Sequence, residues 1–260
     1  MLRWRTLPWK DFKDLHLDSY SYHGERLLPK LLTTINLDEL EESEKEIIDI
    51  LNNWNYNNIG EEIAPAIFRE WWRELYSSIW DNKYSTQIPM RKPDRDVTVD
   101  LIINNPDSPW FNNPETEAVE TFSDLTYPAF KQAISNLNDR FGANKENWKW
   151  GHYNNTNLNH LGQIPGMGVT DLFTDGSNES VNAIWGSHGP SWRMIVELDP
   201  EGVRGYGVYP GGQSGNPGSK TYDEFVETWN NGELFELMFL REKPASDQEF
   251  PLTLRFNSPD

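Results

Sequence analysis

The stretch YPGGQSGNPGSKTYDEF, residues 209–225, places a serine among glycines after an expected strand, which is the setting of an esterase nucleophile. The nucleophile elbow has the pattern Gly-x-Ser-x-Gly, because small neighbours let the serine stand on a strained turn. Gly212 and Ser214 fit this pattern, but Asn216 stands where the second glycine is required. The last histidine, His188, precedes the serine, so the order serine, acid, histidine cannot be completed. A turn-rich connection from a strand into a helix is the simpler interpretation.

Histidines and carboxylates offer no complete site for metal or acid–base chemistry. Of five histidines, His152 and His160 form the one suggestive pair, eight residues apart in an asparagine-rich stretch. Zinc ligands usually have shorter spacings than this. Two hydrogen-bonded histidines are therefore favoured over a metal site. A glycosidase pair among the many acidic residues stays open, since sequence does not give the separation of two carboxyl groups. Sugar stacking by tryptophans is a further alternative, although the spacing of Trp54, Phe68 and Trp72 favours core packing.

Composition disfavours several classes of partner and site. The 260 residues carry a formal net charge of −18, and phosphate binding needs clustered Lys and Arg, so neither nucleic acid nor an anionic membrane surface is expected as a partner. Cysteine is absent, which excludes disulfides and thiolate chemistry. The sequence has no apolar run of about 18 residues, and MLRWRTLPWK lacks the apolar core of a signal peptide.

The positions of apolar residues predict a helical block over residues 1–85. Residues 11–35 have helical spacing, and Pro29 is expected to kink or divide this segment. A second helix is predicted over 37–54, with acidic residues in its first turns, where the helix dipole favours them. A third starts near Ala64 with a proline in its first turn.

The rest of the chain is predicted to be a connection followed by mixed helix and strand. Residues 86–114 are rich in Pro, Asn and Asp and have no sustained period, which indicates a long connection with one short apolar piece, VTVDLII. Residues 115–260 are predicted to mix helix and strand, beginning with a helix that ends at Gly142. The expected strands are 180–185, 191–198 and 203–210, the last two joined by the turn DPEG, and a further helix is expected from about Thr221.

Four motifs follow one another after Trp148: WKWGHYNNTNLNHLG, GSNESVNA, SHGPSWRMIVEL and GVYPGGQSGNPGSKTYDEFVETWNNGELFEL. Their order and spacing resemble the C-terminal part of the β-subunit in the penicillin amidase family of N-terminal-nucleophile hydrolases. That family has a Gly-x-Ser-x-Arg strand, a second strand leading into Pro-Gly-Gln-Ser-Gly, a Tyr-Asp helix and a Trp-x-x-Gly turn. The corresponding residues, expected to be structural, are Gly189, Ser191, Arg193, Pro210, Gly211, Gly212, Gln213, Ser214, Gly215, Tyr222, Asp223, Trp229 and Gly232.

The N-terminal part resembles the family more loosely. FKDLHLDSYSYHGERLLPKLL looks like the helix that follows the substrate-site region in the family. LNNWN stands where family members often have Trp-Asp-Gly, but Trp54 is followed here by Asn55 and Tyr56. The resemblance therefore extends over nearly the whole chain and is strongest from Trp148 to Leu237.

The resemblance implies a catalytic serine outside these motifs. In the family the nucleophile is the first residue of the β-subunit, and its free α-amino group, with a reference pKa near 7.7–8.0, acts as the base. Ser214 resembles the serine of a structural loop instead. Met1 and Leu2 supply no hydroxyl, and cleavage at internal Gly–Ser bonds would leave too few residues for two stacked sheets. We therefore assign no catalytic residue and no metal ligand, and we expect the nucleophile and any calcium ligands in segments that precede this chain.

Together these observations predict an α+β fold that forms part of an αββα N-terminal-nucleophile hydrolase. Residues 1–260 are interpreted as a single C-terminal portion of a penicillin-amidase-like β-subunit, with no cofactor of its own. The expected activity of the whole enzyme is hydrolysis of the amide of N-acyl compounds, such as a β-lactam side chain or an acyl-homoserine lactone. The expected partners are the upstream α-subunit and N-terminal β-subunit segments, with self-association possible. The family implies a periplasmic or secreted location. The alternative is a non-catalytic binding or assembly module that keeps the family scaffold.

Overall fold

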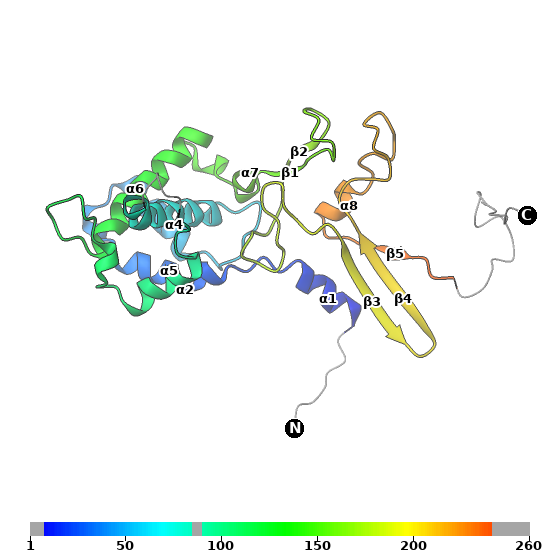
Figure 1. The fold of residues 1–260 in the computed structure, drawn as a ribbon, viewed down its shortest axis with the longest axis horizontal. Coiled ribbons are helices and arrows are strands. Elements are labelled where there is room, and N and C mark those ends of the chain that lie inside the picture. Colours follow the sequence, from blue (N-terminus) through cyan, green and yellow to red (C-terminus); the bar gives the residue numbers. More distant parts are fainter. Residues whose placement is uncertain (1–7, 85–89, 241–260) are drawn as a thin grey trace, which may run out of the picture.

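The computed structural model describes residues 8–84 and 90–240 and shows a helical part joined to a part built on strands (Figure 1). The helices are α1 (Trp9–His16), α2 (Tyr22–Thr33), α3 (Glu42–Asn52), α4 (Ala64–Trp80), α5 (Arg95–Asn104), α6 (Phe122–Phe141), α7 (Trp150–Asn154) and α8 (Val226–Asn230). The strands are β1 (Thr156–Leu158), β2 (Val169–Leu172), β3 (Arg193–Asp199), β4 (Gly202–Val208) and β5 (Phe235–Leu237). Short 3₁₀ helices occur at η1 (Leu37–Glu39), η2 (Asp81–Lys83), η3 (Pro109–Phe111) and η4 (Lys145–Asn147).

We call α2 to α7 the helical lobe, and α1 with β1 to β5 and α8 the strand lobe. All sheet pairing in the described residues is antiparallel: β1 pairs with β2, and β3, β4 and β5 form a second sheet in that order. The predicted α+β class is confirmed. The boundary predicted at residues 85–86 lies outside the described residues.

The core of the helical lobe is built around α4, which packs against α3, α6 and α7. Its predicted apolar stripe is confirmed, because Phe68, Trp72, Leu75 and Ile79 are all buried. Trp71 is buried as well, and its indole N–H donates to the carbonyl of Thr126 on α6, 3.0 Å away. Several of the largest side chains of this core are aromatic, and such side chains bury more apolar area than smaller ones.

Two predicted helix boundaries in the N-terminal part are wrong. The segment 11–35 divides at residues 17–21, where Ser21 caps α2 by accepting a hydrogen bond from the Gly24 N–H. Pro29 instead lies inside α2 at an exposed position, as does Glu25, whose carbonyl loses its helical donor to the proline ring. Helix α3 begins only after Glu41, because a capping box with Glu44 starts the helix there.

Further along the chain, the structure differs from the prediction at three places. The connection 86–114 contains helix α5, which Asp94 caps and which buries Val99 and Ile102. The apolar run 180–185 is not a strand; its contacts are turns and a single bridge from Trp185 to His188. Tyr222 and Asp223 lie in turns, and the helix expected from Thr221 begins at Val226.

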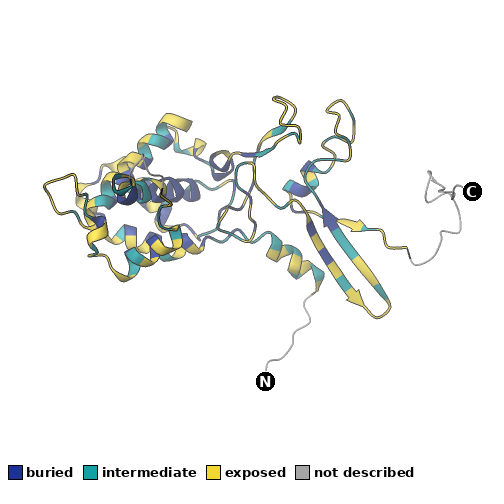
Figure 2. Ribbon diagram, in the orientation of Figure 1, coloured by how far each residue is buried: buried dark blue, intermediate teal, exposed yellow. Residues whose placement is uncertain are grey.

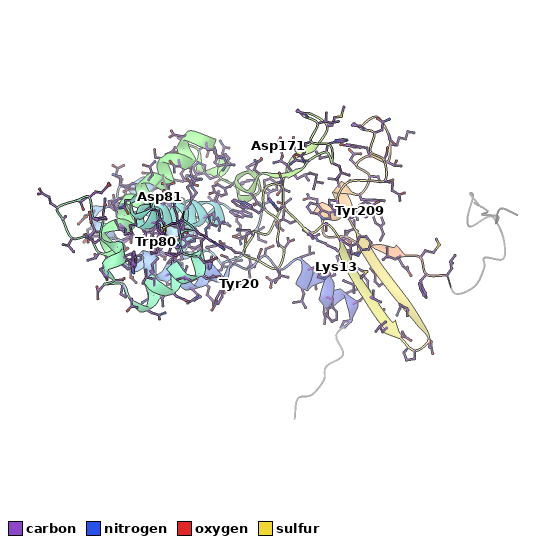
Figure 3. The ribbon with its side chains drawn as sticks, viewed as in Figure 1. Lys13, Tyr20, Trp80, Asp81, Asp171 and Tyr209 are labelled. Atoms are coloured by element: carbon purple, nitrogen blue, oxygen red, sulfur yellow. The ribbon has the colours of Figure 1, made fainter. Side chains whose placement is uncertain are left out.

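The hairpin of β3 and β4 confirms the predicted turn, with Asp199 opposite Gly202. Helix α1 lies against this hairpin, where Trp9 stacks on Tyr206 at 4.3 Å between ring centres. Lys13 of α1, labelled in Figure 3, pairs at 2.7 Å with Glu233, which lies between α8 and β5. Side chains of β3 that alternate with the buried Ile195 are exposed and apolar: Met194, Val196 and Leu198. The hairpin therefore has one face packed against α1 and an apolar face that the described residues leave open (Figure 2).

A buried charge cluster fastens the loop between β2 and β3 to the helical lobe. Glu179 from this loop pairs with Arg69 of α4 and lies 2.9 Å from Nδ1 of His23 on α2. His23 also pairs with Asp96 through Nε2, and Arg95 stands 3.6 Å from Glu179. Burial alone would raise the pKa of Glu179, but His23 and Arg69 outweigh it and lower the pKa to about 2. Burial lowers the pKa of His23, but Glu179 and Asp96 outweigh it and raise this pKa above its usual value.

This cluster predicts a stability maximum at mildly acidic pH. The Glu179 carboxylate stabilises the fold above its ordinary pKa of 4.5, and about 3 kcal/mol is lost as the pH falls toward 2. Protonated His23 stabilises the fold fully below 6.5, and its contribution is lost as the pH rises through its raised pKa. Urea unfolding measured against pH tests both effects. In Glu179→Gln, the free energy of unfolding should fall less steeply as the pH decreases below 4.5. An unchanged pH dependence of this free energy in the variant would contradict the assignment.

Candidate functional site

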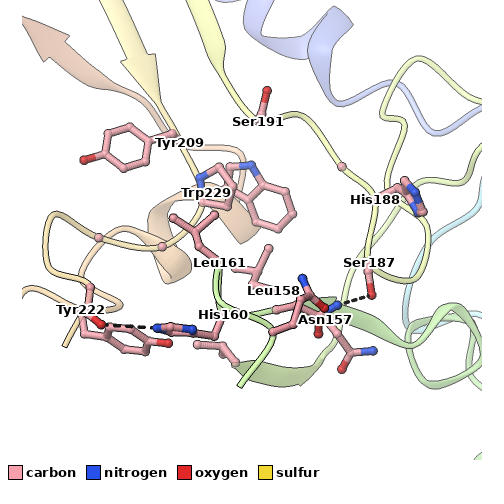
Figure 4. Close-up of a pocket in the computed structure, with 18 of the residues that line it drawn as sticks. Asn157, Leu158, His160, Leu161, Ser187, His188, Ser191, Tyr209, Tyr222 and Trp229 are labelled. Carbon is pink, nitrogen blue, oxygen red and sulfur yellow. Dashed lines mark hydrogen bonds between the residues drawn. The ribbon is translucent and has the colours of Figure 1, made fainter. Parts of the chain in front are cut away.

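The motif residues of the strand lobe gather at a cavity of about 870 Å³ (Figure 4). The sequence-predicted residues that line it are Gly189, Ser191, Pro210, Gly211, Gly212, Ser214, Gly215, Tyr222 and Trp229. Arg193, Gln213, Asp223 and Gly232 stand outside the lining. Segments 189–191 and 209–215, with Tyr222 and Trp229, therefore form one wall of a single cavity. We call it the motif cavity.

The opposite wall comes from β1 and the loop 159–168, none of whose residues is among the structural residues predicted from the sequence. It contributes Asn157, Leu158, His160 and Leu161, and Tyr209 adds an aromatic side to the first wall. The signal for this wall is the motif WKWGHYNNTNLNHLG, which precedes and enters β1. Leu158, Leu161, Tyr209 and Trp229 make the cavity largely apolar, with a few polar groups, which is the usual composition of a small-molecule site.

The two walls are joined by contacts between His160 and residues 209–225, which we call the motif loop. The His160 ring lies 6.5 Å from the Tyr222 ring, and its Nε2 is 3.4 Å from the Gly215 carbonyl oxygen. The hydroxyl of Tyr222 donates to the carbonyl of Met167. On the other side of the cavity, Asn159 donates to the Ser187 hydroxyl at 3.0 Å (Figure 4). These contacts hold the loop 159–168 over the motif cavity.

Ser214 has the surroundings of a turn residue. Its backbone N–H donates to the Thr221 carbonyl at 3.0 Å, and its hydroxyl accepts from the Asn216 N–H at 3.1 Å. Within residues 8–84 and 90–240, no histidine ring makes a hydrogen bond to a serine hydroxyl. A serine without a base within reach stays a weak nucleophile at neutral pH. The geometry therefore supports a structural role for Ser214.

Arg193 and Trp229 connect three of the motifs behind the cavity wall. The buried Arg193 guanidinium donates to the Trp229 carbonyl at 2.8 Å and to Asn182 Oδ1 at 2.9 Å. It also lies 5.4 Å from the centre of the Trp229 ring, whose N–H donates to the Pro190 carbonyl at 2.9 Å. Among the residues that the structure describes, Arg193 makes no ion pair, and burial lowers its pKa to about 10. A buried cation held by neutral acceptors and an aromatic face fixes the positions of all three segments.

Gly212 lies where the motif loop folds back on itself. A Cβ atom at this position would stand 2.2 Å from the Thr221 carbonyl oxygen and 2.6 Å from the backbone of Tyr222. The neighbouring Gly211, and not Gly212, has the positive φ of 97°. The requirement for glycine at position 212 therefore comes from the close approach of two backbone segments and not from a positive φ.

No group of three or more His, Asp or Glu side chains comes together in a metal-binding arrangement in the described part of the chain. In the same part of the chain, no helix is both long and apolar enough to cross a bilayer.

The sequence of residues 3–245 matches the pattern of a known family, described as penicillin amidase. The chain belongs to the penicillin amidase family. Its relatives include the acyl-homoserine lactone acylases QuiP of Pseudomonas syringae pv. tomato and P. syringae pv. syringae. The first is 26% identical over 82% of this chain and 25% of its own length, and the second 25% identical over 75% of this chain and 22% of its own length. The chain thus spans about a quarter of the length of the relatives that it matches.

Penicillin amidase membership accounts for the order of motifs around the cavity. The residues that carry the resemblance form the Arg193–Trp229 contact, the Gly212 crossing and one cavity wall, although they lie up to about 40 residues apart. In the described part of the chain, none of their side chains makes a hydrogen bond to a histidine ring.

Proposed function

We propose that this chain is the C-terminal part of a penicillin-amidase-like hydrolase that cleaves the amide bond of N-acyl compounds. Acyl-homoserine lactones and β-lactam side chains are the two substrate classes that the family and the named relatives suggest. The observation that best supports the proposal is the interlocked unit of Arg193, Asn182, Trp229 and Gly212. This unit links several separate family motifs by direct contact.

In this proposal the nucleophile comes from another segment of the enzyme. A serine with a free α-amino group needs no histidine, because the amino group can accept the hydroxyl proton. This agrees with the lack of a serine–histidine contact among the described residues. The proposed contribution of this chain is the scaffold and an apolar cavity, and the expected location of the enzyme is the periplasm or the exterior of the cell.

The exposed apolar face of the β3–β4 hairpin is the proposed contact surface for the upstream segments of the enzyme. Met194, Val196 and Leu198 alternate along β3 on one face, and Leu198 is 81% exposed. An added sheet layer would cover these side chains, as in the αββα architecture of the family. The upstream α-subunit and N-terminal β-subunit segments are the proposed partners, and self-association through the same face is the alternative.

A test of this function combines the chain with an upstream segment that begins with serine. The chain alone should release no amine from acyl-homoserine lactones or acyl anilides, since the loss of even one oxyanion donor costs about a hundredfold in rate. Mixing or co-expressing the two pieces should give a stable complex that releases the amine. Replacing the first serine of the upstream piece by alanine, as the matched control, should abolish this activity.

Three outcomes separate the proposal from the alternative of a non-catalytic module. Turnover by the chain alone that Ser214→Ala abolishes would contradict it, because the motif loop would then be catalytic. A monomer that captures no upstream segment would favour the binding or assembly module. The gene context gives a further comparison: an upstream coding sequence with a Gly–Ser self-cleavage site supports the hydrolase.

A further inference from the structure

A second cavity, apart from the motif cavity, is lined by four arginines. It has a volume of about 230 Å³ and lies where α4, α5, α6 and α7 meet the turn at Trp185. Arg69 and Arg73 come from α4, Arg95 from the start of α5 and Arg140 from the last turn of α6. Its other lining residues are Tyr153, Asn154, Asn155, Trp185 and Gly186. In a chain with a formal net charge of −18, no carboxylate lines this cavity.

The nearby carboxylates neutralise two of the four arginines well and the other two poorly. Arg69 pairs with Glu179, and Arg73 pairs with Glu70 and lies 3.2 Å from Glu74. Both arginines therefore have a close acidic partner. Because Glu179 also faces His23, its charge is already shared.

Arg95 and Arg140 have weaker partners. Arg95 lies 3.6 Å from Glu179 Oε1, beyond hydrogen-bond distance, and next to the like charge of Arg69. Arg140 makes no ion pair with any described residue. Its guanidinium donates to the Tyr153 carbonyl at 3.2 Å and lies against the rings of Phe141 and Tyr153, at 4.7 and 5.0 Å. Both arginines therefore have free N–H donors for an oxyanion.

We propose that this cavity binds a small tetrahedral oxyanion such as phosphate. Arg95 and Arg140 would donate to its oxygen atoms in the forked geometry that suits phosphate. The ligand is either free phosphate or the phosphoryl group of a larger molecule. This site lies outside the cavity proposed for the amidase function and does not depend on that activity.

Calorimetric titration of the 260-residue chain with inorganic phosphate, at constant ionic strength and near-neutral pH, tests the proposal. One binding site is expected. Arg140→Gln and Arg95→Gln should each weaken binding about tenfold, since a hydrogen bond to a charged group is worth that much. O-phosphoserine distinguishes the sources: tighter binding than phosphate indicates a larger phosphorylated ligand, and weaker binding indicates free phosphate.

The matched control is Arg204→Gln, which removes the same charge from the exposed hairpin and should leave phosphate affinity within twofold. The proposal is overturned if tens of millimolar phosphate gives no binding heat. It is also overturned if Arg204→Gln weakens binding as much as the two cavity variants do, because the anion would then respond only to overall charge. If Arg140→Gln does not fold, Arg95→Gln provides the same comparison, since Arg95 stands at the partly exposed start of α5.

Discussion

Replacement of Arg193 by alanine is expected to lower the free energy of unfolding of the strand lobe by about 3 kcal/mol. The substitution removes the donors to the Trp229 carbonyl and to Asn182 Oδ1, both of which are buried. It also leaves a cavity beside the fully buried Trp229 ring. Urea unfolding followed by tryptophan fluorescence would measure the loss.

Arg204 on the same hairpin provides the control for this prediction. Its side chain is 54% exposed and pairs with Glu197 at 3.0 Å, so Arg204→Ala should change the unfolding free energy by less than about 1 kcal/mol. Equal, small effects of the two substitutions would show that Arg193 does not hold the motifs together.

Gly212→Val is expected to destabilise the motif loop by about 3 kcal/mol. The first added carbon would overlap the backbone of Thr221 and Tyr222, and backbone cannot move aside as a flexible side chain can. The two backbone segments of the loop would separate. This would break the hydrogen bonds from Ser214 N–H to the Thr221 carbonyl and from Phe225 N–H to the Gly211 carbonyl. Hydrogen exchange of these amides, together with the melting temperature, measures the effect.

Ser214→Ala is the matched substitution two residues away. It removes only a hydroxyl that accepts from the Asn216 N–H in a partly exposed turn, so we expect a loss below about 1 kcal/mol. If Gly212→Val changed the amide exchange rates no more than Ser214→Ala does, the close backbone crossing would not constrain the loop.

The elements that could be predicted from the sequence are those whose signals are local. Helix α4 has a continuous apolar stripe and a proline in its first turn, and the β3–β4 hairpin has alternation interrupted by a turn sequence. Asp94 and Ser21 are local signals as well, because each caps a helix. The loop-like composition of residues 86–114 hides the first signal, and the continuous apolar spacing of residues 11–35 hides the second.

What could not be predicted depends on contacts between distant parts of the chain. The run 180–185 is rich in strand-forming residues, yet Asn182 receives the Arg193 guanidinium and donates its N–H to the Asp18 carbonyl, so the segment winds through turns. The cavity wall that contains His160 also depends on such contacts, and so does the four-arginine cavity. Each requires residues from three or more elements, and spacing along the sequence does not reveal which elements meet.

Helix α1 has a consequence for the order in which the chain folds. It belongs to the strand lobe, where Trp9 stacks on Tyr206 and Leu17 fills the space beside Gly232, whose added Cβ would lie 2.2 Å from a Leu17 methyl group. The helical lobe, which lies between α1 and the strands in the sequence, is a continuous segment with its own large core. The strand lobe has a core of three buried residues, Ile184, Val208 and Trp229. During synthesis the helical lobe can therefore fold while the ribosome is still adding strands. The first helix must wait for the β3–β4 hairpin and for Gly232 and Glu233, so the two ends of the described chain assemble together and late.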